Sequence, residues 1–337
     1  MEYIAELEST IKDIAQPGRG ILAADESAAT IAKRFAQINV ESTEDNRRTW
    51  RSLMATTPGL GEYISGIIFF EETLQQTTDA RIPIAEAAWQ QRIVPGIKVD
   101  KGKGPLPLSP GDLITYGLDS LAERLQQYKE SGARFAKWRE VYGIESGIPS
   151  PHGIRANAQM LARYAAVCQS EGIVPIVEPE VLMDGSHEIQ RHAEVTEAVL
   201  HAVFHALHQH HVALELMVLK PNMVLPGKSC RRAHPEEVAK ATLQVLHRTV
   251  PAAVPSINFL SGGQSPQEAT ENLNAINQEP TRAAWRLSIS FGRALQEEAL
   301  KAWQGKPENA AAAQQALLKR ARLNHLAMSG NYKKELE

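Results

Sequence analysis

Short apolar runs recur along the chain, and the segments between them carry apolar residues at helical spacing. One helical stripe contains Leu118, Leu121, Leu125 and Tyr128, and another contains Leu161, Tyr164, Ala165 and Cys168. The runs typical of β-strands lie near residues 20–24, 66–70, 94–99, 133–138, 174–177, 214–219, 256–260 and 287–291. This alternation of short strands with helical segments predicts repeated βα units and a parallel sheet.

Eight strands with eight crossovers favour a single α/β domain over residues 1–337, built as a closed (β/α)8 or TIM barrel. Charged residues follow most of the strands, which is where such a barrel forms its active site. A doubly wound open sheet is the structural alternative, but it does not predict polar groups after so many strands. We also expect helical segments at the N-terminus and over residues 309–328, and a polar tail over residues 329–337.

Two glycine-containing turns follow the seventh and eighth predicted strands. Ser261-Gly-Gly263 precedes Ser265-Pro-Gln-Glu268, which offers a helix an N-cap, a first-turn proline and an N3 carboxylate. Gly292-Arg293 follows the eighth strand. Loops at these two positions often form a phosphate site in such barrels, and amides at a helix start can face an anion. A plain strand-to-helix turn is the alternative for each, but the pair favours phosphate binding.

The segment Leu260-Ser-Gly-Gly-Gln264 also matches the signature of ATP-binding-cassette ATPases. Such an ATPase needs a Gly-x4-Gly-Lys-Ser/Thr phosphate loop as well. The Gly-Lys pairs at Gly102, Gly227 and Gly305 all lack glycine at the required earlier position, so we interpret the match as accidental. The loose Gly18-Arg-Gly20 pattern precedes its strand, which argues against a dinucleotide motif.

The composition excludes several classes of protein. Its 36 basic and 39 acidic residues leave a formal charge of −3, which argues against general affinity for nucleic acid or anionic membranes. Two cysteines, Cys168 and Cys230, exclude a disulfide framework and a four-cysteine zinc site, although one disulfide stays possible. The N-terminus does not resemble a signal peptide, and the apolar runs are too short to span a bilayer. We expect a soluble cytoplasmic protein.

Lys220 ends the apolar run that begins at Val212. Burial beside such a strand disfavours the charged form of a lysine, which makes it a candidate amine nucleophile. A strand-end lysine that reaches solvent is the alternative. Charged residues also stand at the ends of other predicted strands, namely Asp25, Lys98, Lys137 and Glu178. An ion pair explains any two of these residues, whereas one shared pocket explains all of them.

Five histidines between His201 and His211 raise the question of a metal site. His201, His205 and His208 have helical spacing, but their segment leads into the sixth strand as an outer helix, away from the catalytic mouth of a barrel. A solvated helix face is the better interpretation, and we expect no metal.

At these residues the sequence closely resembles the class I, Schiff-base-forming and metal-independent fructose-bisphosphate aldolases. The resemblance covers residues 4–332 and is carried by seven segments. These are Gly20-Ile-Leu-Ala-Ala-Asp-Glu-Ser27, Gly96-Ile-Lys-Val-Asp-Lys-Gly102, Phe135-Ala-Lys-Trp-Arg139, Ile173-Val-Pro-Ile-Val-Glu-Pro-Glu180, Leu219-Lys-Pro-Asn-Met223, Phe259-Leu-Ser-Gly-Gly-Gln264 and Gly292-Arg-Ala-Leu295.

The resemblance implies catalytic roles for five of these residues. Lys220 would attack the C2 ketone of the substrate and form a protonated Schiff base, which draws electrons from the C3–C4 bond. Glu178 would move protons as the carbinolamine forms and loses water, and Asp25 would help remove the C4 hydroxyl proton. Lys137 would favour the neutral Lys220 and stabilise developing oxygen charge, and Glu180 would support these groups.

The same resemblance implies how the substrate is bound. The C1 phosphate would lie on Ser261, Gly262, Gly292 and Arg293, the C6 phosphate near Ser27, Thr30 and Lys98, and Arg34 and Arg139 would be basic positions around the pocket. Two departures from the family pattern affect this expectation. Ala28-Ala29 replaces a small, glycine-containing loop sequence beside Thr30. Many animal and plant relatives also finish with a tyrosine that assists proton exchange, a role that does not transfer to Tyr332.

The resemblance implies reversible cleavage of fructose 1,6-bisphosphate to dihydroxyacetone phosphate and glyceraldehyde 3-phosphate, in glycolysis, gluconeogenesis or the Calvin cycle. Sedoheptulose 1,7-bisphosphate is a further expected substrate. The partners expected are phosphorylated sugars and identical subunits in a homotetramer, with no nucleic acid, membrane, metal or cofactor. A Schiff-base aldolase for another sugar phosphate and a catalytically silent, metabolite-binding barrel are the alternatives.

Overall fold

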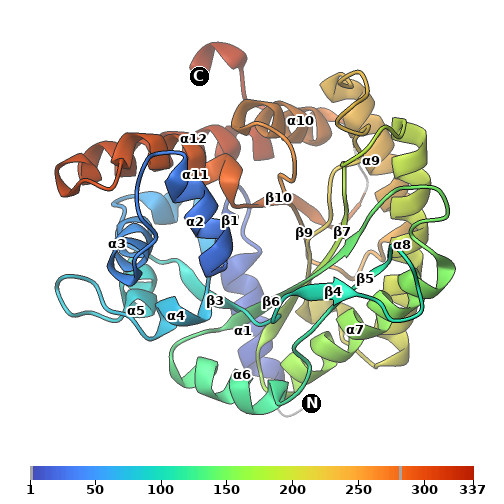
Figure 1. The fold of residues 1–337 in the computed structure, drawn as a ribbon, viewed down its shortest axis with the longest axis horizontal. Helices are drawn as coiled ribbons and strands as arrows, with labels where there is room; N and C mark the ends of the chain where they lie inside the picture. Colours follow the sequence, from blue (N-terminus) through green and yellow to red (C-terminus); the bar gives the residue numbers. More distant parts are fainter. Residues whose placement is uncertain (1–2, 281–282) are drawn as a thin grey trace.

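The computed structural model describes residues 3–280 and 283–337, and within them eight parallel strands close into a barrel (Figure 1). Around the barrel the strands follow the order β1-β10-β9-β8-β7-β6-β3-β2. Their bounds are β1 Gly20–Ala24, β2 Ile64–Phe69, β3 Val94–Lys98, β6 Phe135–Tyr142, β7 Val174–Val181, β8 Val218–Leu219, β9 Ser256–Phe259 and β10 Arg286–Phe291. The predicted TIM barrel is therefore confirmed.

Helices surround the barrel, and α12 lies alongside α10 and α11 on one side (Figure 1). The α-helices in the described residues are α1 Ile4–Ile14, α2 Ala28–Ala36, α3 Glu44–Ala55, α4 Glu71–Leu74, α5 Ile84–Gln90, α6 Leu121–Glu130, α7 Pro151–Ser170, α8 Ile189–Gln209, α9 Pro235–Thr249, α10 Pro266–Gln278, α11 Arg293–Trp303 and α12 Ala310–Met328. Short 3-10 helices are η1 Leu60–Glu62, η2 Leu214–Leu216, η3 Pro307–Asn309 and η4 Lys334–Leu336. None of the helices in 3–280 and 283–337 has the length and apolar character to cross a membrane.

The barrel interior near the start of the strands is filled with apolar side chains. Ile21, Phe135 and Val174 pack in one cluster with Leu7 and Ile14 of α1, so this helix covers the N-terminal end of the barrel. A Cβ at Gly96 would overlap the Phe135 ring, and glycine is therefore needed there for the close approach. Because this end is filled, the polar residues of the strands gather toward the opposite, C-terminal end.

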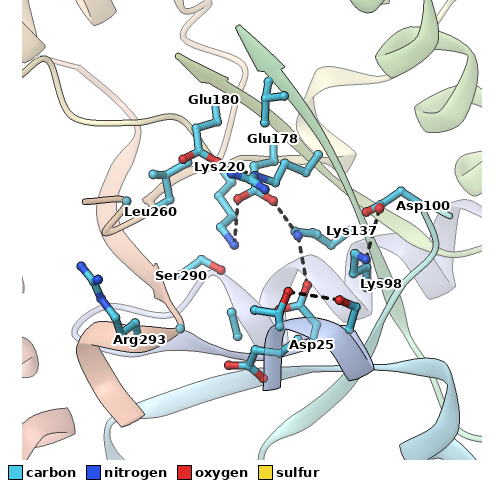
Figure 2. Close-up of a pocket in the computed structure, with 18 of the residues that line it drawn as sticks. Asp25, Lys98, Asp100, Lys137, Glu178, Glu180, Lys220, Leu260, Ser290 and Arg293 are labelled. Carbon is cyan, nitrogen blue, oxygen red and sulfur yellow. Dashed lines mark hydrogen bonds and ion pairs between the residues drawn. The ribbon is translucent and has the colours of Figure 1, made fainter. Parts of the chain in front are cut away.

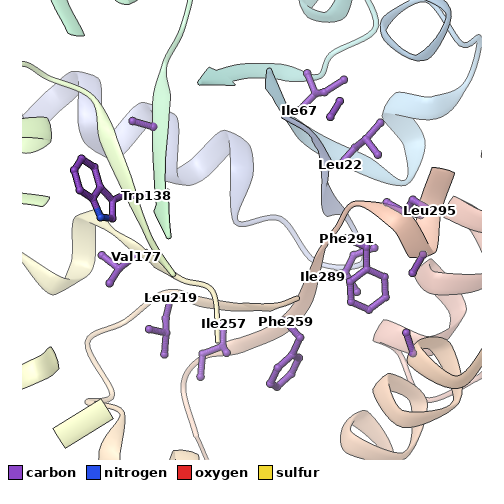
Figure 3. Packing of buried hydrophobic residues seen from close by; sticks show 14 of the residues in the cluster. Leu22, Ile67, Trp138, Val177, Leu219, Ile257, Phe259, Ile289, Phe291 and Leu295 are labelled. Atoms are coloured by element: carbon purple, nitrogen blue, oxygen red, sulfur yellow. The ribbon is translucent and has the colours of Figure 1, made fainter. Parts of the chain in front are cut away.

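The second and larger core lies between the outer face of the barrel and the helices (Figure 3). Successive residues of a strand point to opposite faces, and six of the barrel strands supply both cores, whereas β9 and β10 contribute apolar side chains only to the outer one. In β6, for example, Phe135 faces the interior, whereas the next residue but two, Trp138, is buried in the outer core. Leu22 and Phe291 of neighbouring β1 and β10 belong to the same outer core.

A two-stranded antiparallel sheet, β4 (Lys103–Pro105) with β5 (Leu113–Thr115), lies outside the barrel and was not predicted from the sequence. Each strand has only three residues, which is too short for an alternating pattern to stand out. β5 is bonded to β6, because the Thr115 amide donates to the Glu140 carboxylate at 3.2 Å and the Thr115 hydroxyl donates to the Arg139 carbonyl at 2.8 Å. The hairpin is thereby attached to the barrel wall.

Several predicted boundaries were wrong. Of the strand predicted over 214–219, only Val218–Leu219 is a strand, and Leu214–Leu216 is a 3-10 helix, because a short apolar run fits either state. β6 begins two residues later than predicted and continues to Tyr142, and β7 continues to Val181. The stripe residue Leu118 lies before α6 rather than inside it, although it packs against the core.

The predicted terminal helix is confirmed as α12, but the polar tail after it is not simply solvated. Tyr332 is buried, and its backbone amide donates to Asn274 of α10 at 2.9 Å. The Glu337 carboxylate accepts hydrogen bonds from Arg320 at 2.6 and 2.8 Å and from the Tyr332 hydroxyl at 2.7 Å. Burial of Tyr332 and the hydrogen bonds of the tail with Asn274 and Arg320 therefore attach this segment to the barrel helices, although its composition indicates solvent exposure.

Candidate active site

A cavity of about 480 Å³ opens at the C-terminal end of the barrel and is lined by charged and polar side chains. All fourteen site residues expected from the sequence line it, namely Asp25, Ser27, Thr30, Arg34, Lys98, Lys137, Arg139, Glu178, Glu180, Lys220, Ser261, Gly262, Gly292 and Arg293. Arg139, Glu178 and Glu180 lie inside strands rather than after them, because β6 and β7 continue beyond their predicted ends. Alternation along these strands still places Lys137, Arg139, Glu178 and Glu180 on the inner face.

Lys137 lies at the centre of the site, between two carboxylates from different strands (Figure 2). Its Nζ atom is 3.0 Å from Asp25 Oδ2, at the end of β1, and 2.9 Å from Glu178 Oε2 of β7. Burial alone lowers the pKa of the Lys137 ammonium, but the two carboxylates outweigh burial and raise it above its ordinary value. Lys137 is therefore a permanent cation in this site.

The two carboxylates respond in the opposite sense. Burial raises the pKa of Asp25 and of Glu178, but Lys137 and then Lys220 lower both values by more, so each pKa lies below its ordinary value. Both groups are thus ionised at neutral pH and able to accept a proton. Asp25 faces Lys137 from across the barrel, because β1 and β6 are not neighbours in the sheet.

Lys220 directly follows β8, and its backbone amide donates to the Val177 carbonyl at 2.8 Å. Its side chain is 4% exposed, and its Nζ atom lies 3.2 Å from Glu178 Oε1. Burial lowers the pKa of the Lys220 ammonium, and the Lys137 charge lowers it further, against the opposing effect of Glu178 and Asp25. Of the two central lysines, Lys220 is therefore the one prepared to act as a neutral amine.

Two further ion pairs hold basic side chains at the wall of the cavity. Arg139 contacts Glu180 of the neighbouring β7 through its Nε atom. Lys98, the last residue of β3, pairs with Asp100 at 3.2 Å. A Cβ at Gly262 would lie 2.7 Å from Glu180 Oε1, so the turn after β9 approaches this carboxylate closely and requires glycine.

A buried polar network around Glu26 fixes the loop that follows β1. The Glu26 carboxylate contacts Arg34 of α2, accepts from Gln296 at 2.9 Å, and lies 3.4 Å from the guanidinium of Arg51. Arg51 is fully buried and also donates to the Glu26 carbonyl at 2.9 Å. These contacts fix the backbone between Asp25 and Ser27, whose hydroxyl is 3.1 Å from that of Thr30.

The turns after β9 and β10 are joined by a hydrogen bond. Arg293 donates to the Gln264 carbonyl at 2.6 Å, and the capping box between Ser265 and Glu268 starts α10 as predicted. Figure 2 shows Arg293 and Lys98 on opposite sides of the cavity. The cavity therefore offers one basic group at each side of the central lysines, a spacing suited to a ligand with two anionic ends.

Comparisons with known proteins show the family of this chain. Residues 6–337 match the family model described as fructose-bisphosphate aldolase class-I. The chain is 54% identical over 331 residues to a cytoplasmic isozyme of fructose-bisphosphate aldolase from Spinacia oleracea, covering 98% of this chain and 93% of that protein. It is 55% identical over 332 residues to fructose-bisphosphate aldolase from Drosophila melanogaster, covering 97% and 92%.

A solved structure also matches. Fructose-bisphosphate aldolase from Plasmodium falciparum, crystallised with TRAP and a small-molecule inhibitor, superposes with a TM-score of 0.96 at 49% identity and covers 98% of this chain and 96% of that one. The chain belongs to the class I fructose-bisphosphate aldolase family. As a member of this family, it is a carbon–carbon lyase.

Several pocket residues of this aldolase were not found from the sequence. Glu26, Asp100, Lys103, Thr115 and Ser290 all line the cavity. Ser290 had a usable signal, because it stands two residues after Ser288 in an apolar strand and so shares its face. Thr115 and Lys103 had none, because they belong to the unpredicted hairpin.

The histidine-rich segment of the aldolase lies where the sequence predicts, on α8. His201, His205 and His208 are exposed on this outer helix. Over 3–280 and 283–337 no group of three or more histidine, cysteine, aspartate or glutamate residues is arranged to hold a metal ion. Cys168 and Cys230 are both free thiols, so the one disulfide left open by the composition does not form.

Proposed function

We propose that this aldolase cleaves fructose 1,6-bisphosphate reversibly through a Schiff base on Lys220. The observation that carries the proposal is the buried Lys220 amine, 3.2 Å from Glu178, with Lys137 fixed between Glu178 and Asp25. Glu178 is placed to accept the proton that the Lys220 ammonium loses. The neutral amine then attacks the C2 ketone, and loss of water from the carbinolamine leaves a protonated imine.

The carboxylate of Asp25 takes the proton of the C4 hydroxyl in the next step. The C3–C4 bond breaks, its electron pair passes into the imine to form an enamine, and glyceraldehyde 3-phosphate leaves. Protonation of the enamine at C3 and hydrolysis of the imine release dihydroxyacetone phosphate and restore Lys220. Lys137 remains charged throughout, because its raised pKa keeps the ammonium form, and it stabilises the oxygen charge that develops nearby.

Substrate binding follows from the two sides of the cavity. Ser261, Gly262, Gly292 and Arg293 hold the C1 phosphate, and Ser27, Thr30 and Lys98 hold the C6 phosphate, with Arg34 and Arg139 as further basic groups. The positions of Arg293 and Lys98 on opposite sides support this assignment (Figure 2). Sedoheptulose 1,7-bisphosphate has the same two anionic ends, and we propose it as a second substrate. Comparing turnover of the two bisphosphates tests this point.

Borohydride trapping tests the Schiff base directly. The protein is incubated with fructose 1,6-bisphosphate, reduced with borohydride and mapped by mass spectrometry, with Lys220→Met as the matched control. We expect the reduced adduct on Lys220 in the native protein, none in the variant, and activity that EDTA does not change. Activity that EDTA abolishes, without an adduct at Lys220, would overturn the mechanism. Turnover of other ketose phosphates separates this function from that of an aldolase for a different sugar.

We further propose that the protein works in the cytosol as a homotetramer in glycolysis and gluconeogenesis, and that residues 1–337 form one domain. The spinach and Arabidopsis relatives are named as cytoplasmic or cytosolic enzymes, which supports the location. Two large apolar side chains, Trp89 and Leu108, are exposed on the subunit and are suited to contacts between copies. Sedimentation analysis at several concentrations tests the assembly, and a stable monomer would contradict it.

A further inference from the structure

Gln296 of α11 is a buried amide, 2% exposed, that the proposed mechanism does not use. Its Nε2 atom donates to the Ala23 carbonyl at 2.6 Å and to Glu26 Oε1 at 2.9 Å. Its Oε1 atom accepts from the indole of Trp50 at 3.2 Å. Because an indole N–H can only donate, it fixes which end of the amide faces Trp50. Both N–H groups of Gln296 are therefore directed at the end of β1 and the residues after it.

Asp25 lies between the two residues that accept from Gln296, just beyond the paired part of its strand. The register of β1 with β10 ends at Leu22, and its register with β2 ends at Ala24. The sheet therefore fixes the backbone before Asp25. The backbone after Asp25 depends instead on side chains that reach it from the outer helices.

Arg51 of α3 provides a second attachment on the far side of Asp25. Its fully buried guanidinium donates to the Glu26 carbonyl at 2.9 Å and to the hydroxyl of Thr73 on α4 at 3.1 Å. Gln296 and Arg51 thus hold the backbone before and after Asp25 from separate helices. The Asp25 carboxylate contacts Lys137 at 3.0 Å, so the place of its oxygen atoms in the cavity depends on where this backbone holds the residue.

We propose that Gln296 is a positioning residue which, together with Arg51, holds Asp25 at the C4 hydroxyl of the substrate. This inference rests on the proposed function, because that function gives Asp25 the C4 proton. Gln296 then acts on the breaking of the C3–C4 bond and not on formation of the Schiff base. The groups that form the imine, Lys220 and Glu178, come from the end of β8 and from β7, outside the hydrogen bonds of Gln296.

Two reactions separate these steps. Cleavage of fructose 1,6-bisphosphate needs removal of the C4 hydroxyl proton. Exchange of the carbon-bound proton of dihydroxyacetone phosphate with solvent needs the imine and the enamine on Lys220, but this substrate has no C4 hydroxyl. A displacement of about 1 Å in a catalytic group can lower a rate by about a hundredfold. A shift of Asp25 should therefore slow cleavage and leave exchange close to its native rate.

Gln296→Met tests the proposal, because methionine keeps the length of the side chain and removes its amide. We expect kcat for cleavage to fall by about ten- to a hundredfold. Proton exchange of dihydroxyacetone phosphate in deuterium oxide, followed by NMR, and borohydride trapping on Lys220 should stay close to native. Gln169→Met is the matched control, because Gln169 is also 2% exposed and donates to the Ala213 and Leu216 carbonyls, before β8. Its ratio of cleavage to exchange should equal that of the native protein.

Combining Gln296→Met with Asp25→Asn shows whether Gln296 acts through Asp25. If it does, Gln296→Met should lower the residual cleavage of Asp25→Asn by much less than it lowers native cleavage. Arg51→Lys gives an independent variant, since it keeps the charge and replaces the guanidinium fork by one nitrogen. It should also slow cleavage more than exchange.

The inference would be overturned if Gln296→Met and Arg51→Lys slowed both reactions equally, or if the full loss persisted in the Asp25→Asn background. Native kcat for cleavage in Gln296→Met would overturn it as well. Failure to trap an adduct on Lys220 of the native protein would instead contradict the proposed function.

Discussion

Glu140 provides a test of how burial on the outer face of β6 affects stability. Its side chain is 1% exposed, yet it is a carboxylic acid in a strand whose opposite face carries Lys137 and Arg139. Burial raises the pKa of Glu140 to about 7, although the indole of Trp138 at 2.9 Å and the amide of Thr115 at 3.2 Å donate hydrogen bonds that oppose the increase. We consider the substitution Glu140→Gln.

The sign of the effect follows from proton binding in the two states. Between an ordinary glutamate pKa of 4.5 and the folded value of about 7, the unfolded chain is ionised and the folded protein keeps its proton. Stability therefore falls as the pH rises through this window, by roughly 3 kcal/mol for a single group with this difference in pKa. Glutamine does not titrate, so the unfolding free energy of Glu140→Gln does not fall for this reason as the pH rises.

Urea unfolding followed by circular dichroism, at about pH 5 and about pH 8, measures the effect. We expect Glu140→Gln to gain stability relative to the native protein by about 2 kcal/mol or more between the two pH values. Other titrating groups change both proteins equally, and the exposed substitution Glu123→Gln controls for the change in net charge. The reasoning would be refuted if the difference in unfolding free energy between Glu140→Gln and the native protein were the same at both pH values.

Two further substitutions test other buried charges. Lys137→Met removes the cation shared by Asp25 and Glu178, so we expect a loss of about 3–5 kcal/mol in unfolding free energy and at least about a hundredfold fall in kcat. Native-like stability in urea would contradict the first expectation. Glu337→Gln weakens the shorter of the two carboxylate pairings of the Arg320 guanidinium, which is 1% exposed, and should cost about 1–3 kcal/mol relative to the exposed control Glu335→Gln. Equal unfolding midpoints for these two variants would count against it.

The architecture could be predicted because strands and helices differ in period over enough residues. The run before Asp25 and the run before Lys98 are each bounded by polar residues, and both became strands over nearly the predicted residues. The strand predicted before Lys220 was less accurate. Its first half is a 3-10 helix, because the apolar run Leu214 to Leu219 contains no signal that separates the two conformations.

The candidate site could be predicted where its members stand at or near strand ends, because a closed barrel brings those ends together. Asp25 and Lys220 follow this rule. Partners that depend on contacts between distant segments could not be predicted. Arg51 of α3 supports Glu26 across the loop after β1, and Lys103 enters the cavity from a three-residue strand. Neither position carries a periodic pattern, so only the folded chain reveals them.

The contact between Asp25 and Lys137 can form only when the barrel is closed, because it joins two strands that are not adjacent in the sheet. Asp25 directly follows β1 and Lys137 lies on β6, and these two strands are separated by two strands on one side of the barrel and by four on the other. The first six strands of the chain supply both residues, whereas Glu178 and Lys220 come from β7 and the end of β8. Neither half of the molecule contains the nucleophile and the cation together. Turnover can therefore serve as a sensitive report of reassembly if the chain is divided between β6 and β7, because only correctly docked halves recreate the chemistry.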